Sequence, residues 1–323
     1  IQAAEYYDVT YNVYRDGTKL NAEPLNVSNY QDKSGTATST YTVKAVVRGV
    51  EQDACKPVSV WSNSYKEIKL THEGIASKLI PNDACCADVD GDGELEILMK
   101  FDNDSEAAQS YPKAGPTVNG KVTGEYSIFE ILKMDGKRLW WVNCGPNMGD
   151  FQNNEQNIVG YDWDQDGKAE VIMRLEEGSS IHMADGTVYT IGANGKNGGS
   201  WTNYRGATGG GTNWFMCVGK EFLVYCDGET GNVLDIIDFP LARLEPGETD
   251  LNKAWGDGYG HRASKFFFGA PYLDGKHPSI FLARGIYTQI KMCAFDVDLA
   301  TNKLKKRWDW RQTNGGFWMW QGY

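Results

Sequence analysis

Hydrophobic and polar residues alternate along short segments of the first seventy positions. Three segments rich in Val, Thr and Tyr lie at 11–21, 39–50 and 56–70. Alternation of this kind is typical of β-strands with one buried face. The pair Asp16-Gly17 supplies the left-handed backbone that a two-residue hairpin turn requires. The pattern predicts a small β-sandwich over residues 1–70, with its first strands missing from the chain.

A different pattern begins after residue 80, where an acidic loop and the strand that follows it occur twice. DVDGDGELEILMKFD at 88–102 returns 74 residues later as DWDQDGKAEVIMRLE at 162–176. A second unit, two strands joined by an Asp-led turn, occurs at 126–141, 220–239 and 291–310. Recurrence of strand-rich units at intervals of tens of residues is typical of radial all-β arrays. The sequence therefore predicts a β-propeller and excludes a helical solenoid.

The predicted propeller occupies residues 71–323 and is truncated at its C-terminus. About three units and the start of another at 315–323 are present, whereas closed propellers have four to eight blades. The Gly- and Asn-rich segment 178–214 lies inside the second unit, and we expect it to be an insertion at a blade edge. The predicted fold class is thus all-β, a sandwich followed by the first blades of a propeller.

Carboxylates in the two acidic loops are spaced as ligands of a hard cation. Asp stands at positions 1, 3 and 5 of each loop, Gly at position 6 and Glu at position 9, and Ca²⁺ prefers six to eight oxygen ligands. The residue at position 7 would offer its backbone carbonyl. The predicted calcium ligands are Asp88, Asp90, Asp92, Glu94 and Glu96 in the first loop and Asp162, Asp164, Asp166, Lys168 and Glu170 in the second.

Other interpretations of the two loops stay open. One is an acidic, solvated turn, although clustered carboxylates repel one another without a cation. Another is an architectural ion that stiffens the blades, which we prefer to an ion with a direct catalytic role. The loops are not EF-hands, because position 12 is Met99 or Met173 and the flanking segments are predicted strands.

Aromatic and basic residues beside glycines form a second candidate site. Tyr259 and Tyr287 lie in WGDGYGHR and RGIYT, where their rings would stack on the apolar faces of sugars. Arg262 and Arg284 could each form a bidentate pair with a substrate carboxylate. The alternative is that these arginines tie blades together through ion pairs, such as one with Asp257.

Composition excludes several classes of function. The chain has 43 acidic and 32 basic residues and a net charge of −11, which argues against sequence-independent binding of nucleic acid. No apolar run approaches the ~18 residues of a membrane-spanning helix. None of the seven cysteines belongs to a CxxC pair, which disfavours a zinc or thioredoxin-like site. The motifs of serine hydrolases, P-loop enzymes and zinc proteases are also absent from the sequence.

One histidine is a candidate for proton exchange at the site. His261 lies beside Arg262 and could exchange protons near neutral pH. His72, His182 and His277 lack the spacing to a second His or Cys that metal ligation requires. We expect these three side chains in turns or on the surface.

Five motifs follow one another in a fixed order. They are PNDACCADVDGDGELEILMKFD, YDWDQDGKAEVIMR, WGDGYGHR, YLDGKHPS and RGIYT. In this order they resemble the rhamnogalacturonan lyases of polysaccharide lyase family 11, and the opening YNVYRDGTKLN with YTVKAVVRGVEQ resembles the fibronectin type III-like sandwich of that family. The chain departs from the family pattern in the 178–214 insertion and at Gln165, where glycine is usual.

The resemblance implies an eight-bladed propeller, stabilised by calcium, that cleaves the rhamnose–galacturonate backbone of pectin by β-elimination. It also implies substrate contacts at Asn82 and Asp102, with plain capping of the blade edge as the alternative for Asp102. Removal of the proton on C5 requires that a cation or an Arg neutralise the galacturonate carboxylate. The family pattern places much of the catalytic machinery beyond Tyr323, so no catalytic base is assigned.

The resemblance further implies a partner and a location. The partner is a pectic polysaccharide, rhamnogalacturonan I, and the location is secreted, periplasmic or on the surface of a bacterium. We separately expect the protein to be a monomer. Because the net charge of −11 repels a polyanion, attraction must come from local Ca²⁺, Arg and Lys. A calcium-stabilised propeller that binds carbohydrate or mediates adhesion without chemistry is the alternative function, and an inactive lyase homologue also stays open.

Overall fold

The computed structural model is all-β in the residues that it describes, apart from three short helical segments. The described residues are 9–70, 79–103, 117–118, 121–122, 127–148, 158–204, 217–257 and 260–311. The chain divides into two compact units, Ile1–Lys69 with Tyr272–His277, and Leu70–Pro271 with Pro278–Tyr323. The predicted all-β class is confirmed.

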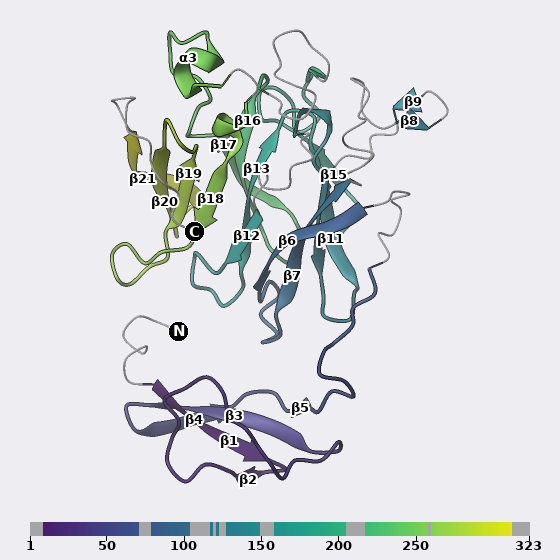
Figure 1. The fold of residues 1–323 in the computed structure, drawn as a ribbon, viewed down its shortest axis with the longest axis vertical. Coiled ribbons are helices and arrows are strands. Elements are labelled where there is room, and N and C mark those ends of the chain that lie inside the picture. Colours follow the sequence, from purple (N-terminus) through teal and green to yellow (C-terminus); the bar gives the residue numbers. More distant parts are fainter. Residues whose placement is uncertain are drawn as a thin grey trace. The chain divides into compact units, whose positions relative to one another are not determined.

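The described strands of the first unit form one antiparallel sheet (Figure 1). These strands are β1 (Val9–Arg15), β2 (Thr18–Lys19), β3 (Thr40–Val47), β4 (Val50–Ala54) and β5 (Val58–Ser59). Their order is β2-β1-β3-β4, and β5 pairs with β3. Asp16 and Gly17 have φ angles of 50° and 80°, so the predicted hairpin is confirmed. The second layer of a fibronectin-like sandwich stays a prediction.

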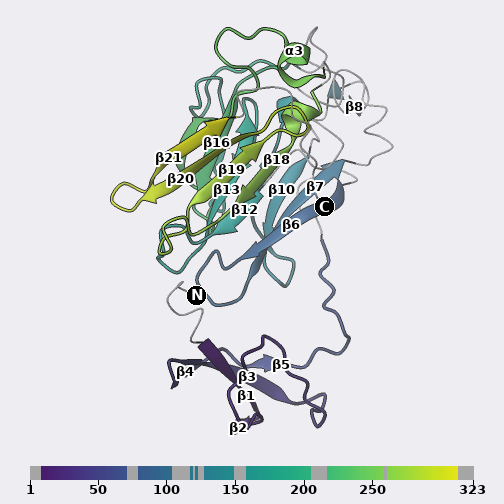
Figure 2. The same ribbon diagram turned by 60° about the vertical axis from the view of Figure 1, so that its left-hand side comes forward.

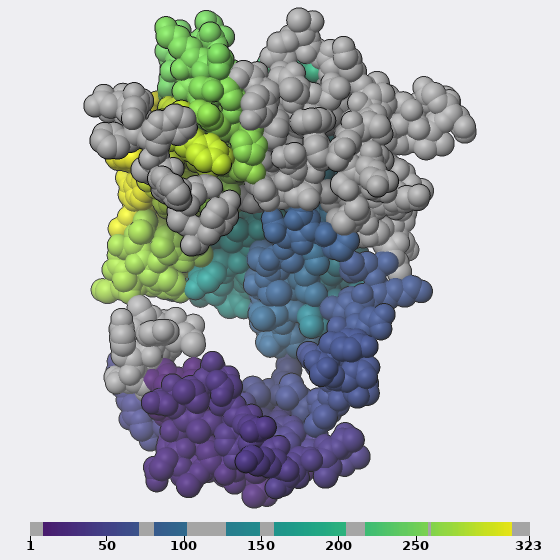
Figure 3. Space-filling view, viewed as in Figure 1, coloured from purple at the N-terminus to yellow at the C-terminus, as the bar shows by residue number. Residues whose placement is uncertain are grey.

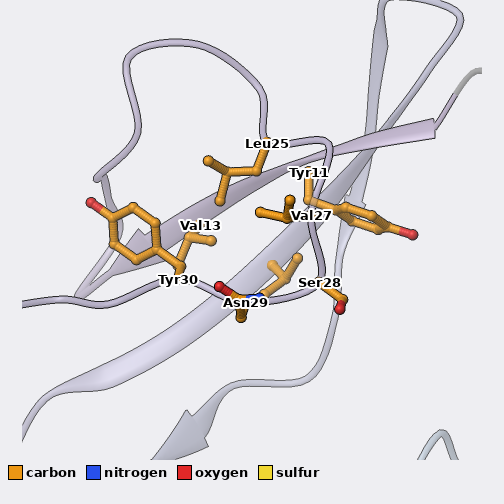
Figure 4. Close-up of a pocket in the computed structure, with 8 residues that line it drawn as sticks. Tyr11, Val13, Leu25, Val27, Ser28, Asn29 and Tyr30 are labelled. Atoms are coloured by element: carbon orange, nitrogen blue, oxygen red, sulfur yellow. The ribbon is translucent and has the colours of Figure 1, made fainter.

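A pocket of about 370 Å³ lies on one face of this sheet (Figure 4). Tyr11 and Leu25 exchange two backbone hydrogen bonds of 2.8 Å, which hold the segment after Leu25 beside β1. The lining residues are Tyr11, Val13, Leu25, Val27, Ser28, Asn29, Tyr30 and Val43. Val27 is 49% exposed, so part of this apolar lining faces solvent.

Three antiparallel sheets make up most of the second unit. The first contains β6 (Leu79–Ala87), β7 (Glu96–Asn103), β10 (Ile128–Leu132), β11 (Arg138–Asn143), β14 (Ser180–His182) and β15 (Val188–Thr190). The second contains β12 (Ile158–Tyr161), β13 (Glu170–Glu176), β16 (Glu221–Cys226) and β17 (Val233–Asp238). The third contains β18 (Phe266–Gly269), β19 (Ile280–Arg284), β20 (Lys291–Asp298) and β21 (Lys303–Arg311).

Short elements complete the second unit. They are the β8 (Thr117–Val118) and β9 (Lys121–Val122) pair, the helix α3 (Leu251–Trp255), and the 3-10 turns η1 (Pro146–Met148) and η2 (Arg262–Ser264). Asp250 caps α3 by accepting a hydrogen bond from the Lys253 N–H, and Gly256 ends the helix with a φ of 74°. Among the described residues, no helix has the length and apolarity needed to cross a membrane.

The three sheets pack against one another in chain order (Figures 1 and 2). Phe129 and Val142 of the first sheet share one core with Val171 and Met173 of the second. A second core joins the other face of the second sheet, including Ile172, to the third sheet. The space-filling view shows the teal second sheet between the blue first sheet and the yellow-green third sheet (Figure 3). Alternate strand residues therefore face different neighbours, which explains strands that are apolar on both faces.

The predicted insertion extends a different sheet from the one that contains it in sequence. The segment after β13 forms β14 and β15, and Trp141 of β11 pairs with His182 of β14. These two strands therefore widen the first sheet beyond β11. The strands that flank them in sequence, β13 and β16, belong to the second sheet. Gly178, with a φ of 89°, turns the chain, and the Ser179 hydroxyl donates to the Cys144 carbonyl over 2.7 Å. The expectation of a segment at a sheet edge is correct for these strands, but the edge belongs to the first sheet and not to the sheet of the flanking strands β13 and β16. Residues 205–214 of the predicted insertion lie outside the described residues.

Candidate functional site

Two acidic loops lie beside each other in neighbouring sheets. The first joins β6 to β7, and the second joins β12 to β13. The Ala169 N–H of the second loop donates to the Asp88 carbonyl of the first over 2.8 Å. A Cβ atom added at Gly91 would lie 3.1 Å from Cγ of Lys168. The sequence repeat thus produces two adjoining loops of the same design.

The first residue of each loop holds the turn with its carboxylate. Asp88 accepts hydrogen bonds from the N–H groups at positions 4, 5 and 6 over 2.8, 3.1 and 2.8 Å. Asp162 accepts from positions 5 and 6, each over 3.1 Å. Gly93 and Gly167 at position 6 have φ angles of 85° and 96°, a conformation that favours glycine. Gln165 adopts a φ of 63° at position 4, where the first loop has glycine.

Carboxylates from positions 1, 3 and 9 converge in each loop. One oxygen atom from each of the three lies within 4.8 Å of the others in the sets Asp88, Asp90, Glu96 and Asp162, Asp164, Glu170. Glu96 and Glu170 are only 1% and 6% exposed. Each accepts a hydrogen bond from the N–H of position 2, over 2.9 and 3.1 Å respectively. These six predicted calcium ligands therefore converge in the fold, while their binding of Ca²⁺ stays a prediction.

Positions 5 and 7 are not part of these convergent sets. Asp92 and Asp166 each accept a hydrogen bond from the N–H of position 7, over 2.7 and 2.8 Å. The Lys168 ammonium lies 2.7 Å from a carboxylate oxygen of Glu229, outside the loop. Cation ligation by Asp92, Asp166 and the carbonyls of Glu94 and Lys168 stays a prediction.

The charges of both loops fit a bound cation. The Lys133 ammonium contacts Asp90 and lies 3.5 Å from Asp92 and 3.6 Å from Glu96, so the first loop already surrounds a positive group. Among the described residues, no Lys or Arg forms an ion pair with the convergent set of the second loop. There, burial and the charge of Asp164 raise the pKa of Glu170 to about 8. A hard divalent cation would offset this repulsion, and donors that are all oxygen suit Ca²⁺.

Asn82 and Asp102 lie at the same end of two paired strands. Asn82 is half-buried in β6, at a register shift between Pro81 and Ala84. Asp102 pairs with Ile80 in the same ladder, while its side chain lies outside the described residues. The fold therefore brings their backbones close, and their contact with substrate stays a prediction.

Arg262 and Tyr287 come together beside η2. The Arg262 guanidinium lies 5.6 Å from the centre of the Tyr287 ring. The same guanidinium donates to the Trp255 carbonyl over 3.2 Å, and its Nε is 3.8 Å from Asp257. The pair with Asp257, the alternative offered by the sequence, is therefore present. Tyr259, the other predicted stacking residue, lies outside the described residues.

Arg284 is placed where a polysaccharide does not reach it. Its side chain is completely buried, and its Nη1 lies 2.7 Å from Glu221. It also donates to the carbonyls of Leu241 and Ala263 over 2.8 and 2.6 Å. The prediction that Arg284 binds a substrate carboxylate is corrected, because its hydrogen bonds are made inside the protein. The structure instead supports the alternative that this arginine ties neighbouring parts of the fold together, because it links the third sheet to Glu221 of the second.

Arg284 belongs to a buried ionic cluster between the second and third sheets. The cluster consists of Arg174, Glu176, Glu221, Arg243 and Arg284. Burial opposes ionisation of Glu221, yet the surrounding guanidinium groups, above all that of Arg243, hold its pKa well below the ordinary value. Sequence reasoning missed this cluster, since only Arg284 stood out, and its partners come from distant strands and from the segment after β17.

His261 immediately precedes Arg262 in the sequence, and its side chain is half-buried. Burial, and then the positive charge of Lys265, lowers the pKa of His261 below its ordinary value. The imidazole is therefore neutral at pH 7 and able to accept a proton. Its predicted role in proton exchange is not tested by this geometry.

The all-β chain with its two adjoining acidic loops matches known protein families along most of its length. Residues 64–322 match the family described as rhamnogalacturonan lyase family 11, C-terminal domain. Residues 1–61 match the rhamnogalacturonan I lyases beta-sheet domain. The chain belongs to rhamnogalacturonan lyase family 11.

Two curated relatives come from Bacillus subtilis strain 168. The rhamnogalacturonan endolyase YesW is 37% identical over 320 residues, which cover 97% of this chain and 46% of that protein. The rhamnogalacturonan exolyase YesX is 33% identical over 314 residues, which cover 94% of this chain and 46% of that protein. This chain thus spans about half the length of the curated relatives it matches.

Solved structures agree with these matches. The crystal structure of YesW aligns with a TM-score of 0.65 at 34% identity, covering 98% of this chain and 50% of that one. The structure of the rhamnogalacturonan lyase PL11 of Bacillus licheniformis aligns with a TM-score of 0.65 at 31% identity, covering 96% of this chain and 49% of that one.

Proposed function

We propose that this chain forms part of a polysaccharide lyase that cleaves rhamnogalacturonan I, the rhamnose–galacturonate backbone of pectin, by β-elimination. The observation that carries the proposal is the 37% identity to a rhamnogalacturonan endolyase along 97% of the chain. The three packed sheets are the first blades of a calcium-binding propeller, eight-bladed when complete. The first unit is a fibronectin type III-like sandwich.

The reaction sets clear demands on the site. A base removes the proton on C5 of a galacturonate, a double bond forms between C4 and C5, and the glycosidic oxygen on C4 leaves with the bonding electrons. Negative charge develops next to the carboxylate, so a cationic group must lie close to it in the transition state. No base is assigned within this chain.

Arg262 and Tyr287 meet part of these demands. The Arg262 side chain is 22% exposed, and Tyr287 is 40% exposed, so both are accessible to a ligand. The guanidinium orients and neutralises a galacturonate carboxylate, while the ring stacks on the adjoining sugar. The neighbouring Asp257 fixes Arg262 by accepting a hydrogen bond from its backbone N–H over 2.8 Å. Asn82 and Asp102 provide polar contacts on the first sheet.

The two acidic loops hold Ca²⁺ in this proposal. When bound, the ions supply positive charge that cross-links the strands of each loop and attracts an acidic polysaccharide locally. Asp88, Asp90 and Glu96 hold the first ion. Asp162, Asp164 and Glu170 hold the second. The protein acts as a monomer that is secreted, periplasmic or on the cell surface of a bacterium.

The proposal is tested by incubating the protein at its full natural length with rhamnogalacturonan I backbone. The expected result is growth of the ultraviolet absorbance of unsaturated uronate, abolished by a chelator. A flat trace with retained polysaccharide binding would replace the lyase by the carbohydrate-binding alternative. A flat trace without binding would refute both.

A matched pair of variants tests the role of Arg262. Arg262→Gln should lower kcat/KM about 100-fold, because one positioned donor at the developing charge is lost. Arg307→Gln is the control, because Arg307 pairs with Asp296 at 3.0 Å on β20 and β21, and it should keep full activity. Equal activity of the two variants would contradict the assignment.

A further inference from the structure

Lys133 places a positive charge inside the first acidic loop. It follows β10 directly, and its ammonium contacts Asp90 while lying 3.5 Å from Asp92 and 3.6 Å from Glu96. Its side chain is 27% exposed and that of Glu96 only 2%, so the interaction reaches the buried base of the loop. Three carboxylates from positions 3, 5 and 9 therefore share one ammonium group.

Strand register identifies the equivalent residue in the second loop. Leu132 pairs with Ile97, the residue after Glu96, and Cys226 pairs with Val171, the residue after Glu170. The next residue along each strand is Lys133 in one sheet and Asp227 in the other. Both open a hairpin turn in the same way, because the N–H of each donates to a carbonyl across the turn over 2.9 Å.

The two positions therefore carry opposite charges in otherwise repeated surroundings. The Asp227 carboxylate accepts hydrogen bonds from the N–H and hydroxyl of Thr230. The lysine within the second loop, Lys168, pairs with Glu229 instead of the convergent carboxylates. The first loop thus has a monovalent cation built into it, and the second has an additional carboxylate nearby.

We propose that Lys133 is an internal substitute for the divalent cation of the first loop, so that only the second loop depends strongly on Ca²⁺. A divalent ion that enters the first loop has to displace an ammonium group from three carboxylates, and it is repelled by that charge until it does. An ion that enters the second loop meets no such competitor among the residues that the structure describes. The two loops therefore fill at different calcium concentrations, the second before the first.

This inference rests on the proposed calcium occupancy of the loops and not on lyase activity. Its tests contain no polysaccharide, so failure of the lyase proposal leaves the result unchanged. An active lyase could equally well fail the tests below. The two proposals are therefore distinguishable.

The first experiment is calorimetric titration with CaCl₂ of the chain carrying Asp164→Asn, which disables the second loop. Lys133→Met in this background should raise the calcium affinity of the first loop about tenfold or more. Lys137→Met is the matched control, because Lys137 lies exposed in the same hairpin turn, and it should change the affinity less than about twofold. Equal affinities in the Lys133 and Lys137 variants, or weaker binding after Lys133→Met, would overturn the proposal.

The reciprocal experiment uses Tb³⁺ luminescence in the otherwise unchanged chain. Trp163 is at position 2 of the second loop, and its backbone N–H donates to the carboxylate of Glu170 over 3.1 Å. Its indole is therefore close enough to sensitise Tb³⁺ bound in that loop. Asp227→Lys should weaken Tb³⁺ binding about tenfold relative to Asp227→Asn, which removes the charge without adding a cation. Near-ultraviolet circular dichroism verifies that both variants are folded. Equal Tb³⁺ affinity in these two folded variants would also overturn the proposal.

Discussion

Glycine at position 6 of each acidic loop adopts a backbone that other residues reach only with strain. Gly167 has a φ of 96°, and an added Cβ would meet no atom within 4 Å. Gly167→Ala should therefore lower the free energy of unfolding by about 1–2 kcal/mol through backbone strain alone. Urea unfolding of the two proteins measures the difference.

Gly269→Ala is the control for that substitution. Gly269 also has no atom within 4 Å of an added Cβ, but its φ is not positive. Its replacement should change the free energy of unfolding by less than about 0.5 kcal/mol. A loss of equal size at both positions would contradict the explanation by backbone strain.

His182 stacks on Trp141, with ring centres 3.8 Å apart. Burial, and then the charge of Arg138, lowers the pKa of His182 below 6.5. Between the folded and unfolded pKa values the unfolded chain binds a proton that the folded chain does not, so stability falls as the pH falls through about 6.5. His182→Phe keeps the stack and removes the titration.

The expected outcome is a shallower loss of stability on acidification for the Phe variant. Thermal unfolding between pH 7.5 and 5 measures it, because the parent protein should lose more stability over this interval than the variant. Parallel curves for the two proteins would show that His182 does not contribute to the pH dependence.

The elements differ in how far the sequence alone predicts them. The acidic loops were predictable because their converging ligands lie within nine consecutive positions, and a turn alone brings them together. Lys133 contacts the same carboxylates, but only the register between β7 and β10 reveals it. The insertion was predictable as a segment at a sheet edge, whereas its pairing with β11 depends on tertiary packing that no local pattern contains. Arg284 was wrongly predicted to bind substrate, because the type of a residue does not reveal whether its side chain at the end of a strand is buried.

The buried ionic cluster joins β13, β16 and β19 and so links two sheets. Glu221 contacts Arg174 and Arg284 at 2.9 and 2.7 Å. Glu221→Gln keeps the shape of the side chain but leaves buried guanidinium groups without their counter-charge. We expect a loss of about 3–5 kcal/mol in the free energy of unfolding, measured by chemical denaturation.

The comparison is with an exposed ion pair in the same sheet. Glu229, whose side chain is 46% exposed, pairs with Lys168. Glu229→Gln should cost less than about 1 kcal/mol, because solvent screens the pair. If both substitutions lowered the free energy of unfolding by the same amount, the buried cluster would stabilise the fold no more than an exposed ion pair does.

At the scale of the whole molecule, calcium should stabilise the second unit. An ion that binds only the folded state adds about 2.7 kcal/mol when its free concentration is 100 times Kd. Removal of calcium by a chelator should therefore lower the Tm of the second unit, followed by tryptophan fluorescence. Magnesium should not restore it, since the smaller ion demands a tighter octahedral shell. An unchanged Tm in excess chelator would refute calcium binding to the folded loops.

The outer strands of the first sheet have a consequence for the order of events during synthesis. β14 and β15 complete that sheet, yet the ribosome makes them only after β12 and β13 of the second sheet. A nascent chain that ends at Met148 leaves the β11 edge unpaired, and such an edge is open to pairing with another chain. The first two sheets of the second unit therefore have to mature as one folding unit, and an expression fragment that stops between them is expected to aggregate.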